Sequence, residues 1–205
     1  MYFANLCYNK NEVIVVRIIA GQNRGRKLKS VPGMKTRPTA DRVKEAVFSS
    51  IDGLLYGCRF LDVFSGTGSI SLEAVSRGAE EAVLLEKDVD ALKVIQENIT
   101  ACGQQQRCKL LRGDSLASLD ALGRQNKQFD LIYVDPPYQS GLYEMVLQKI
   151  AAKELLASHG MILLECAKNA SLSVENSIFF IYKEKVYGDT RIVYLKYKGN
   201  EEEIL

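Results

Sequence analysis

From residue 59 onward, short apolar runs alternate with amphipathic stretches, and this alternation restricts the fold more than any other feature of the chain. The apolar runs have the length of buried strands, and stretches such as 89–101 and 142–155 have helical spacing. Strand–helix–strand repeats form right-handed crossovers, so the sequence predicts a doubly wound, mostly parallel α/β sheet of seven strands. Five of these strands are predicted at 59–64, 82–86, 109–112, 129–135 and 161–166.

The end of the chain departs from this alternation. SIFFIYKEKVY (177–187) and RIVYLKYK (191–198) are both strand-like, and a turn containing Gly188 joins them. They predict an antiparallel hairpin at the sheet edge, because tight turns connect antiparallel neighbours. An acidic tail, 199–205, is expected beyond it.

Basic residues are concentrated near the amino terminus. The basic segment, residues 17–44, holds nine Lys or Arg and one acid, so its charge is +8 within a chain of net charge +2. Such an asymmetry favours a polyanion-binding arm. Gly21, Gly25 and Gly33 favour a hairpin or loop that approaches phosphates closely. A helix over 38–51 should follow, capped by Thr36 or Thr39, with a set of apolar residues on one face: Val43, Val47, Ile51 and Leu54.

Composition excludes several classes of protein. The single histidine, His159, lies beside Gly160 in an expected turn and argues against histidine-based metal or triad chemistry. No apolar stretch reaches the roughly 18–20 residues of a membrane span, and the amino terminus lacks the basic start of a signal peptide. Five cysteines without a CxxC pair indicate reduced, buried thiols in a cytoplasmic protein: Cys7, Cys58, Cys102, Cys108 and Cys166.

A glycine turn follows the first predicted strand in LDVFSGTGSISLEA (61–74). Gly66 and Gly68 allow a tight strand-to-helix turn that a ligand can approach, while Asp62 beside them disfavours pyrophosphate and suits a cation. Glu86 ends the next strand, where an acid can accept hydrogen bonds from ribose hydroxyls. Asp114 follows the third strand and is placed to accept from an adenine amino group. Together these acids predict a pocket for S-adenosylmethionine, which is a positively charged adenosine derivative.

The stretch FDLIYVDPPY (129–138) places two prolines directly after a buried strand. Prolines cannot donate to a sheet ladder, so they end the strand in a rigid, extended turn. The Asp135 carboxylate and the Pro136 carbonyl can accept the two hydrogens of a planar amine, and Tyr138 offers a ring for stacking. This pattern predicts transfer of a methyl group to an exocyclic nitrogen, mainly by positioning and electrostatics.

In order along the chain, DVFSGTGS, Glu86, GDS and DPPY resemble a class I S-adenosylmethionine-dependent methyltransferase. RIIAGQNRGRKL (17–28) and RPTADRVKEAVF (37–48) narrow the resemblance to the RsmD family, which methylates N2 of a guanine in bacterial small-subunit ribosomal RNA. The resemblance runs from about residue 17 to 198. It implies 16S ribosomal RNA as the partner. We also expect a partly assembled subunit as the substrate, a monomeric enzyme and no metal, while the sequence leaves naked RNA and the oligomeric state open.

The resemblance also implies roles for individual residues. The catalytic set would be Asp135, Pro136, Pro137 and Tyr138. The cofactor set would be Asp62, Phe64, Gly66, Gly68, Glu86, Asp114 and Ser115. The RNA-binding set would be Arg17, Arg24, Arg26, Lys27, Arg37 and Arg42. Arg37 and Thr39 could instead face the carboxylate of the cofactor, and the sequence leaves both assignments open.

Three other functions remain open: a DNA amino-methyltransferase, a protein glutamine methyltransferase, and a ribosome-assembly protein that binds RNA without catalysis. Only twenty residues separate Asp114 from Asp135, which leaves no room for a DNA target-recognition domain there.

We expect a basic RNA-binding arm (17–55) and a methyltransferase domain (56–198). Residues 1–16 precede the usual start of the family. Translation from Val15 or Val16 is one hypothesis for them, which the intact mass of the native protein tests.

Overall fold

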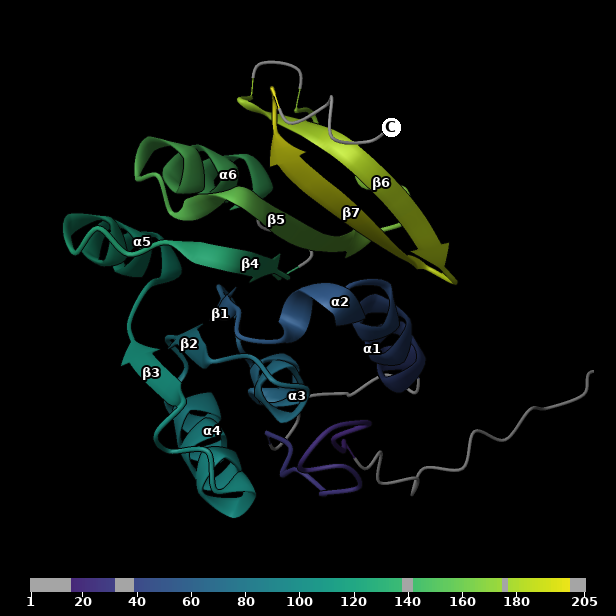
Figure 1. Ribbon diagram of the computed structural model, residues 1–205, viewed down its shortest axis with the longest axis vertical. Helices are drawn as coiled ribbons and strands as arrows, with labels where there is room; N and C mark the ends of the chain where they lie inside the picture. Colours follow the sequence, from purple (N-terminus) through teal and green to yellow (C-terminus); the bar gives the residue numbers. More distant parts are fainter. Residues whose placement is uncertain (1–15, 32–38, 138–141, 175–176, 200–205) are drawn as a thin grey trace, which may run out of the picture.

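The computed structural model describes residues 16–31, 39–137, 142–174 and 177–199. Seven strands form one sheet in the order β3-β2-β1-β4-β5-β7-β6 (Figure 1). The first five strands run parallel, and β7 is antiparallel to both β5 and β6. The strands are β1 (Arg59–Asp62), β2 (Glu81–Glu86), β3 (Cys108–Arg112), β4 (Phe129–Val134), β5 (Leu156–Ala167), β6 (Phe179–Tyr187) and β7 (Thr190–Tyr197).

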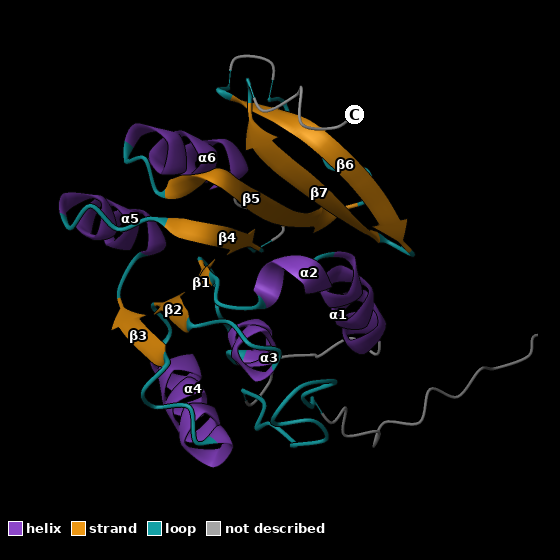
Figure 2. Cartoon of the chain, in the orientation of Figure 1, coloured by secondary structure: helices purple, strands orange, loops and turns teal. Residues whose placement is uncertain are grey.

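Helices cover both faces of this sheet (Figure 2). One buried cluster joins α1, α3 and α4 to the sheet, and a second cluster joins α5 and α6 to the opposite face. The predicted doubly wound α/β fold with a carboxyl-terminal antiparallel hairpin is therefore confirmed. The helices are α1 (Thr39–Ser50), α2 (Asp52–Leu55), α3 (Ser69–Ser76), α4 (Val89–Cys102), α5 (Ser115–Arg124) and α6 (Leu142–Ala152).

Alternation along the central strands decides which side chains share a face. Leu61 and Leu164 belong to the cluster under α5 and α6, whereas Phe60, Tyr133 and Leu163 belong to the cluster under α1, α3 and α4. Because side chains alternate with a period of two, Asp62 falls on the same face as Phe60. The face under α1, α3 and α4 therefore carries polar groups at the carboxyl ends of its strands.

Two local predictions are wrong. His159 lies within β5, which begins at Leu156, and not in a turn. Leu54 is 49% exposed because helix α1 ends at Ser50 and a separate short helix, α2, begins at Asp52. In α2 it is Leu55 that is buried. Thr36 and Gly33 lie outside the described residues, and Thr39 is the first residue of α1.

The predicted hairpin in the basic segment is present. Arg17 and Lys27 form an antiparallel bridge, and Ile18 exchanges backbone hydrogen bonds with Gly25 and Arg26. Gly21 has φ 80°, and a Cβ there would lie 1.9 Å from the Ser76 carbonyl oxygen of α3. Glycine at this position therefore lets the hairpin, residues 16–28, lie directly against α3.

Among the described residues, no helix has the length and apolar character needed to cross a membrane. The cysteines in the described part are unpaired and buried: Cys58, Cys102, Cys108 and Cys166. Burial raises the pKa of Cys58 and of Cys108 to about 12, so these two thiols stay protonated and poorly reactive. Cys7 lies outside the described residues.

Candidate functional site

The glycine turn connects β1 to α3 at the centre of the sheet. Gly66 and Gly68 have φ 54° and 75°, a region that favours glycine. The Gly68 N–H donates to the Ser65 carbonyl oxygen at 2.7 Å, which closes the turn. A Cβ on Gly68 would also lie 3.2 Å from Leu84 Cδ2. Backbone geometry thus requires both glycines, and the turn lies at the amino end of α3.

Asp62 is the last residue of β1, just before this turn, and is 1% exposed. Its Oδ2 accepts a hydrogen bond from Ser71 Oγ at 2.9 Å. Burial raises the pKa of the Asp62 carboxyl to about 7, and hydrogen bonds such as that from Ser71 oppose the rise. A cation placed beside this carboxyl would restore its negative charge, so the group is suited to a positively charged ligand.

Glu86 at the end of β2 is held by backbone groups. Its Oε2 accepts from the Gly66 N–H at 2.9 Å, and its Oε1 accepts from the N–H groups of Lys87 and Asp88 at 2.8 and 2.9 Å. These bonds fix the carboxylate at the rim of the glycine turn. Two of the three acids predicted from the sequence therefore meet at one edge of the sheet.

The third acid and its neighbour have structural roles as well. Asp114 is the N-cap of α5, where its Oδ1 accepts from the N–H groups of Leu116 and Ala117 at 3.0 and 3.2 Å. Ser115 is buried, and its Oγ donates to the Val63 carbonyl oxygen at 2.8 Å, which ties α5 to the end of β1. The N-cap of Asp114 and the hydrogen bond of Ser115 give both residues a structural role. Contacts of Asp114 and Ser115 with a ligand stay predictions.

Asp135 follows β4, which lies between β1 and β5 in the sheet. Pro136 is buried and Pro137 is exposed, whereas Tyr138 lies outside the described residues. Tyr133, two residues before Asp135, is paired in register with Asp62. Burial raises the pKa of Asp135 well above its usual range, and the nearby charges of Glu165 and Asp62 raise it further. The DPP turn and the glycine turn therefore follow adjacent strands of the sheet.

Sequence reasoning missed Glu165 and Tyr133. The Tyr133 hydroxyl donates a hydrogen bond to Glu165 Oε2, although 32 residues separate the two along the chain. Burial raises the pKa of Glu165, and this hydrogen bond opposes the rise. The one available signal was an acid inside the apolar run MILLECA (161–167), since a buried charge requires a partner or a function.

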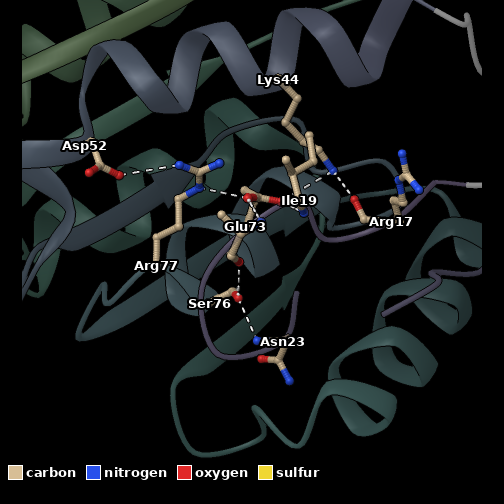
Figure 3. A network of polar contacts seen from close by, with 9 residues as sticks. Arg17, Ile19, Asn23, Lys44, Asp52, Glu73, Ser76 and Arg77 are labelled. Atoms are coloured by element: carbon tan, nitrogen blue, oxygen red, sulfur yellow. Dashed lines mark hydrogen bonds and ion pairs between the residues drawn. The ribbon is translucent and has the colours of Figure 1, made fainter. Parts of the chain in front are cut away.

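Glu73 anchors the hairpin to α3 (Figure 3). This side chain is fully buried and accepts hydrogen bonds from the N–H groups of Ile19 and Ala20 at 2.7 and 3.0 Å. Arg77 Nε donates to it at 2.8 Å, and Lys44 Nζ lies 3.7 Å from its Oε2. One carboxylate therefore joins the hairpin, α1 and α3.

Asn98 of α4 makes a second link, this time to the glycine turn. Its Oδ1 accepts from the Lys29 N–H at 2.8 Å, and its Nδ2 donates to the Lys29 and Thr67 carbonyl oxygens at 3.0 and 2.9 Å. Thr67 lies between the two glycines of the turn. The same buried amide thus holds both the basic segment and the glycine turn.

The basic side chains of the hairpin are all exposed, and so is Lys29 directly after it: Arg17, Arg24, Arg26, Lys27 and Lys29. Arg42 on α1 is exposed too, and Arg37 lies outside the described residues. Lys44, which the charge count assigned to the arm, is 4% exposed and paired with Glu73. The surface charge of the arm is therefore smaller than the sequence suggested.

Known proteins match most of this chain. A family model described as "Conserved hypothetical protein 95" matches residues 16–196. The Bacillus subtilis protein "Putative rRNA methyltransferase YlbH" is 31% identical over 184 residues, covering 90% of this chain and 100% of the relative. "Ribosomal RNA small subunit methyltransferase D" of Escherichia coli is 30% identical, covering 84% of this chain and 85% of the relative. The chain belongs to the RsmD family.

A solved structure supports the same conclusion. The chain titled "Putative methyltransferase yhhF from Escherichia coli" superposes with a TM-score of 0.77 at 30% identity, covering 89% of this chain and 98% of that one. The resemblance predicted from RIIAGQNRGRKL and DPPY is therefore confirmed for the family and the fold.

S-adenosylmethionine is the cofactor of this family, and the described residues fit it. The turn at Gly66 and Gly68 brings backbone close to a ligand, Asp62 is a buried acid beside it, and Glu86 supplies a fixed carboxylate. An anionic dinucleotide would meet repulsion from the same acids. These acidic acceptors match a positively charged adenosine derivative.

Proposed function

We propose that this protein is an S-adenosylmethionine-dependent methyltransferase that modifies the exocyclic N2 of a guanine in bacterial 16S ribosomal RNA. One observation carries the proposal: Asp135 and the Pro136 turn follow β4, which is hydrogen-bonded to the strand that ends in Asp62 and the glycine turn. The name of the Escherichia coli relative supports ribosomal RNA of the small subunit as the substrate.

S-adenosylmethionine would supply a methyl group activated by its positively charged sulfur. Asp62 and Glu86 would hold the cofactor, while Phe64, Asp114 and Ser115 would complete the walls of its site. The Asp135 carboxylate and the Pro136 carbonyl would accept the two N2 hydrogens of guanine, which turns the nitrogen lone pair toward the methyl group. Asp135 would then take the proton that the methylated nitrogen loses. Positioning supplies most of the rate in such a reaction.

The hairpin and α1 would hold the RNA. In this proposal residues 17–55 are the RNA-binding arm, and residues 56–198 are the methyltransferase domain. Arg17, Arg24, Arg26, Lys27, Arg37 and Arg42 would contact phosphates, which adds affinity without reading sequence. The target guanine would be taken out of its stack and laid on Tyr138, at a cost of a few kcal/mol. Rigid attachment through Glu73 and Asn98 supports this division of labour, because an ordered arm loses little entropy on binding.

The substrate would be a partly assembled small subunit, and the enzyme would act in the cytoplasm as a monomer. Extraction of a base costs less where the nucleotide is unpaired, which favours a loop or bulge that proteins have not yet covered. A comparison of small-subunit particles with naked RNA as substrates tests the first of these proposals.

The test is transfer of labelled methyl groups to small-subunit particles and to naked RNA from a strain that lacks the gene. Wild type should label one guanine N2, mapped by nuclease digestion and mass spectrometry. Asp135→Asn keeps the shape of the side chain but removes its charge, and should lower the rate by roughly 10²-fold or more. Asp90→Asn, the same change at an exposed site on α4 paired with Lys93, is the matched control and should leave the rate unchanged.

Two other outcomes would contradict the proposal. Label on DNA or on a protein would retain the chemistry of the DPP turn and replace the substrate. RNA binding without cofactor binding would point to a non-catalytic assembly protein, because the pocket would then have no occupant.

A further inference from the structure

The residues beside Asp135 form a group of acids at the carboxyl ends of three adjacent strands. Asp62 ends β1, Asp135 follows β4, and Glu165 lies near the end of β5. Val134 is paired in register with Leu164, so the next residue of each strand, Asp135 and Glu165, are also neighbours. Strand alternation places all three acids on the sheet face that α1, α3 and α4 cover.

Tyr133 occupies the space between these acids. It is 2% exposed, lies opposite Asp62 in the ladder, and donates its hydroxyl to Glu165. Asp62, Asp135 and Glu165 all raise the pKa of the Tyr133 hydroxyl, after burial as the largest cause, which indicates that their charges act on one small region. Tyr133 therefore stays protonated and remains a donor to Glu165.

The surrounding elements supply little positive charge to this group. β7 contributes Tyr194, whose hydroxyl is hydrogen-bonded to Ser50 of α1 at 2.7 Å. β6 contributes Tyr187, which packs against the same cluster, and Lys183, whose Nζ stands 4.3 Å from the centre of the Tyr194 ring. Glu86 adds a further negative charge beside Asp62. Negative groups thus dominate the described surroundings of Asp135.

Hydrogen bonding distinguishes the two acids of the pair. Glu165 receives the Tyr133 hydroxyl, which favours its ionised form. Asp135 lies next to that charge and directly precedes Pro136 and Pro137, neither of which has an N–H group to donate. Neighbouring carboxyls in a pocket of low polarity share protons, because both cannot ionise without strong repulsion.

We propose that Glu165 and Asp135 form a proton-sharing carboxyl pair, with Glu165 fixed by Tyr133, and that the pair releases a proton when the positively charged cofactor binds. This inference rests on the proposed function and adds a positioning residue, Glu165, to it. Before binding, Glu165 is ionised and Asp135 holds the proton. A positive charge beside the pair makes two carboxylates tolerable, so Asp135 ionises and becomes an acceptor for the target amine.

The proton returns in the same cycle. Asp135 takes a proton from the amine as the nitrogen forms its bond to the methyl carbon and the carbon–sulfur bond breaks with its electron pair on sulfur. The sulfur compound is then neutral, and the pair of Glu165 and Asp135 again holds one proton, as it did before the cofactor was bound. The proton that the pair released to solvent on cofactor binding thus equals the proton that it takes from the amine, so charge and protons balance over the cycle.

Calorimetry tests this directly, without measuring turnover. The probes are S-adenosylmethionine and S-adenosylhomocysteine, titrated at pH 7 into the full chain in buffers of different ionisation enthalpy. The two ligands share the amino acid and the adenosine, so the difference in protons released reports the sulfur charge. We expect S-adenosylmethionine to release about 0.5–1 proton more than S-adenosylhomocysteine does.

Two variants and one control make the test specific. Glu165→Gln removes the repelling charge, so Asp135 is already ionised and the excess release should fall by at least half. Tyr133→Phe removes the donor to Glu165, so the release should shift to higher pH. Glu81→Gln, the same change at the opposite end of β2, should leave the release as in wild type.

The outcomes separate the inference from the proposed function. Equal proton release by the two ligands, or an excess that Glu165→Gln leaves intact, would overturn the carboxyl pair while cofactor binding still supports a methyltransferase. Failure of wild type to bind S-adenosylmethionine at all would overturn both.

Discussion

Glu73→Ala should release the basic hairpin from α3 and lower the free energy of unfolding of the whole protein. The change removes one fully buried carboxylate, which orphans two hairpin N–H groups (Ile19 and Ala20) and leaves two cations without their shared partner. Breaking a buried ion pair on one side costs about 3–5 kcal/mol, and an orphaned N–H group costs about 1–3 kcal/mol.

These costs do not add, because both cations keep other contacts. Lys44 Nζ still donates to the Arg17 carbonyl oxygen at 2.6 Å, and Arg77 Nη1 stays 3.4 Å from Asp52. We therefore expect a loss of about 3–5 kcal/mol in all, out of the roughly 5–15 kcal/mol typical of a domain. With a urea dependence of about 2 kcal/mol per molar, the unfolding midpoint should fall by about 2 M.

Urea unfolding followed by circular dichroism measures the loss, and hydrogen exchange of the Ile19 and Ala20 amides locates it. Glu97→Ala is the matched control: it removes an exposed glutamate that pairs with Lys29 at 2.9 Å, and it should cost less than about 1 kcal/mol. Equal losses in the two variants, or unchanged exchange at Ile19 and Ala20, would refute the claim that Glu73 anchors the hairpin.

Two further predictions concern the cofactor pocket and the RNA. Because the folded pKa of Asp62 is raised to about 7 from an ordinary 3.8, the carboxyl favours the folded state at low pH, and this stability is lost as pH rises through that interval. The stability of Asp62→Asn relative to wild type should therefore increase with pH between about 4 and 7, by up to about 1.4 kcal/mol per pH unit. Urea unfolding midpoints that differ by the same amount at every pH from about 4 to 8 would contradict this. Arg26→Ala should weaken RNA binding and lower the slope of log affinity against log salt by about 0.7–0.9, whereas an unchanged slope would remove Arg26 from the RNA-contacting surface.

The sequence alone determined the features that depend on neighbours in the chain. Strand and helix periods predicted the doubly wound sheet, because burial on one or two faces imposes a local repeat. Gly66 and Gly68 predicted a tight turn, and both have φ above zero in the structure. Pro136 predicted the end of β4. Both effects are properties of one or two residues. Asp62, Glu86 and Asp114 could be assigned to one edge, because parallel strands end on the same side of a sheet.

Tertiary structure decided the features that depend on pairing between distant segments. Lys44 looked like part of a basic surface, but the packing of α1 against α3 buries it beside Glu73. Glu165 lies beside Asp135 because β5 is the neighbour of β4 and the two strands pair in a register that aligns these residues. The residue pattern within either strand predicts neither the strand order nor the register. Local sequence fixes which face a side chain occupies, whereas the partner across that face is chosen by the fold as a whole.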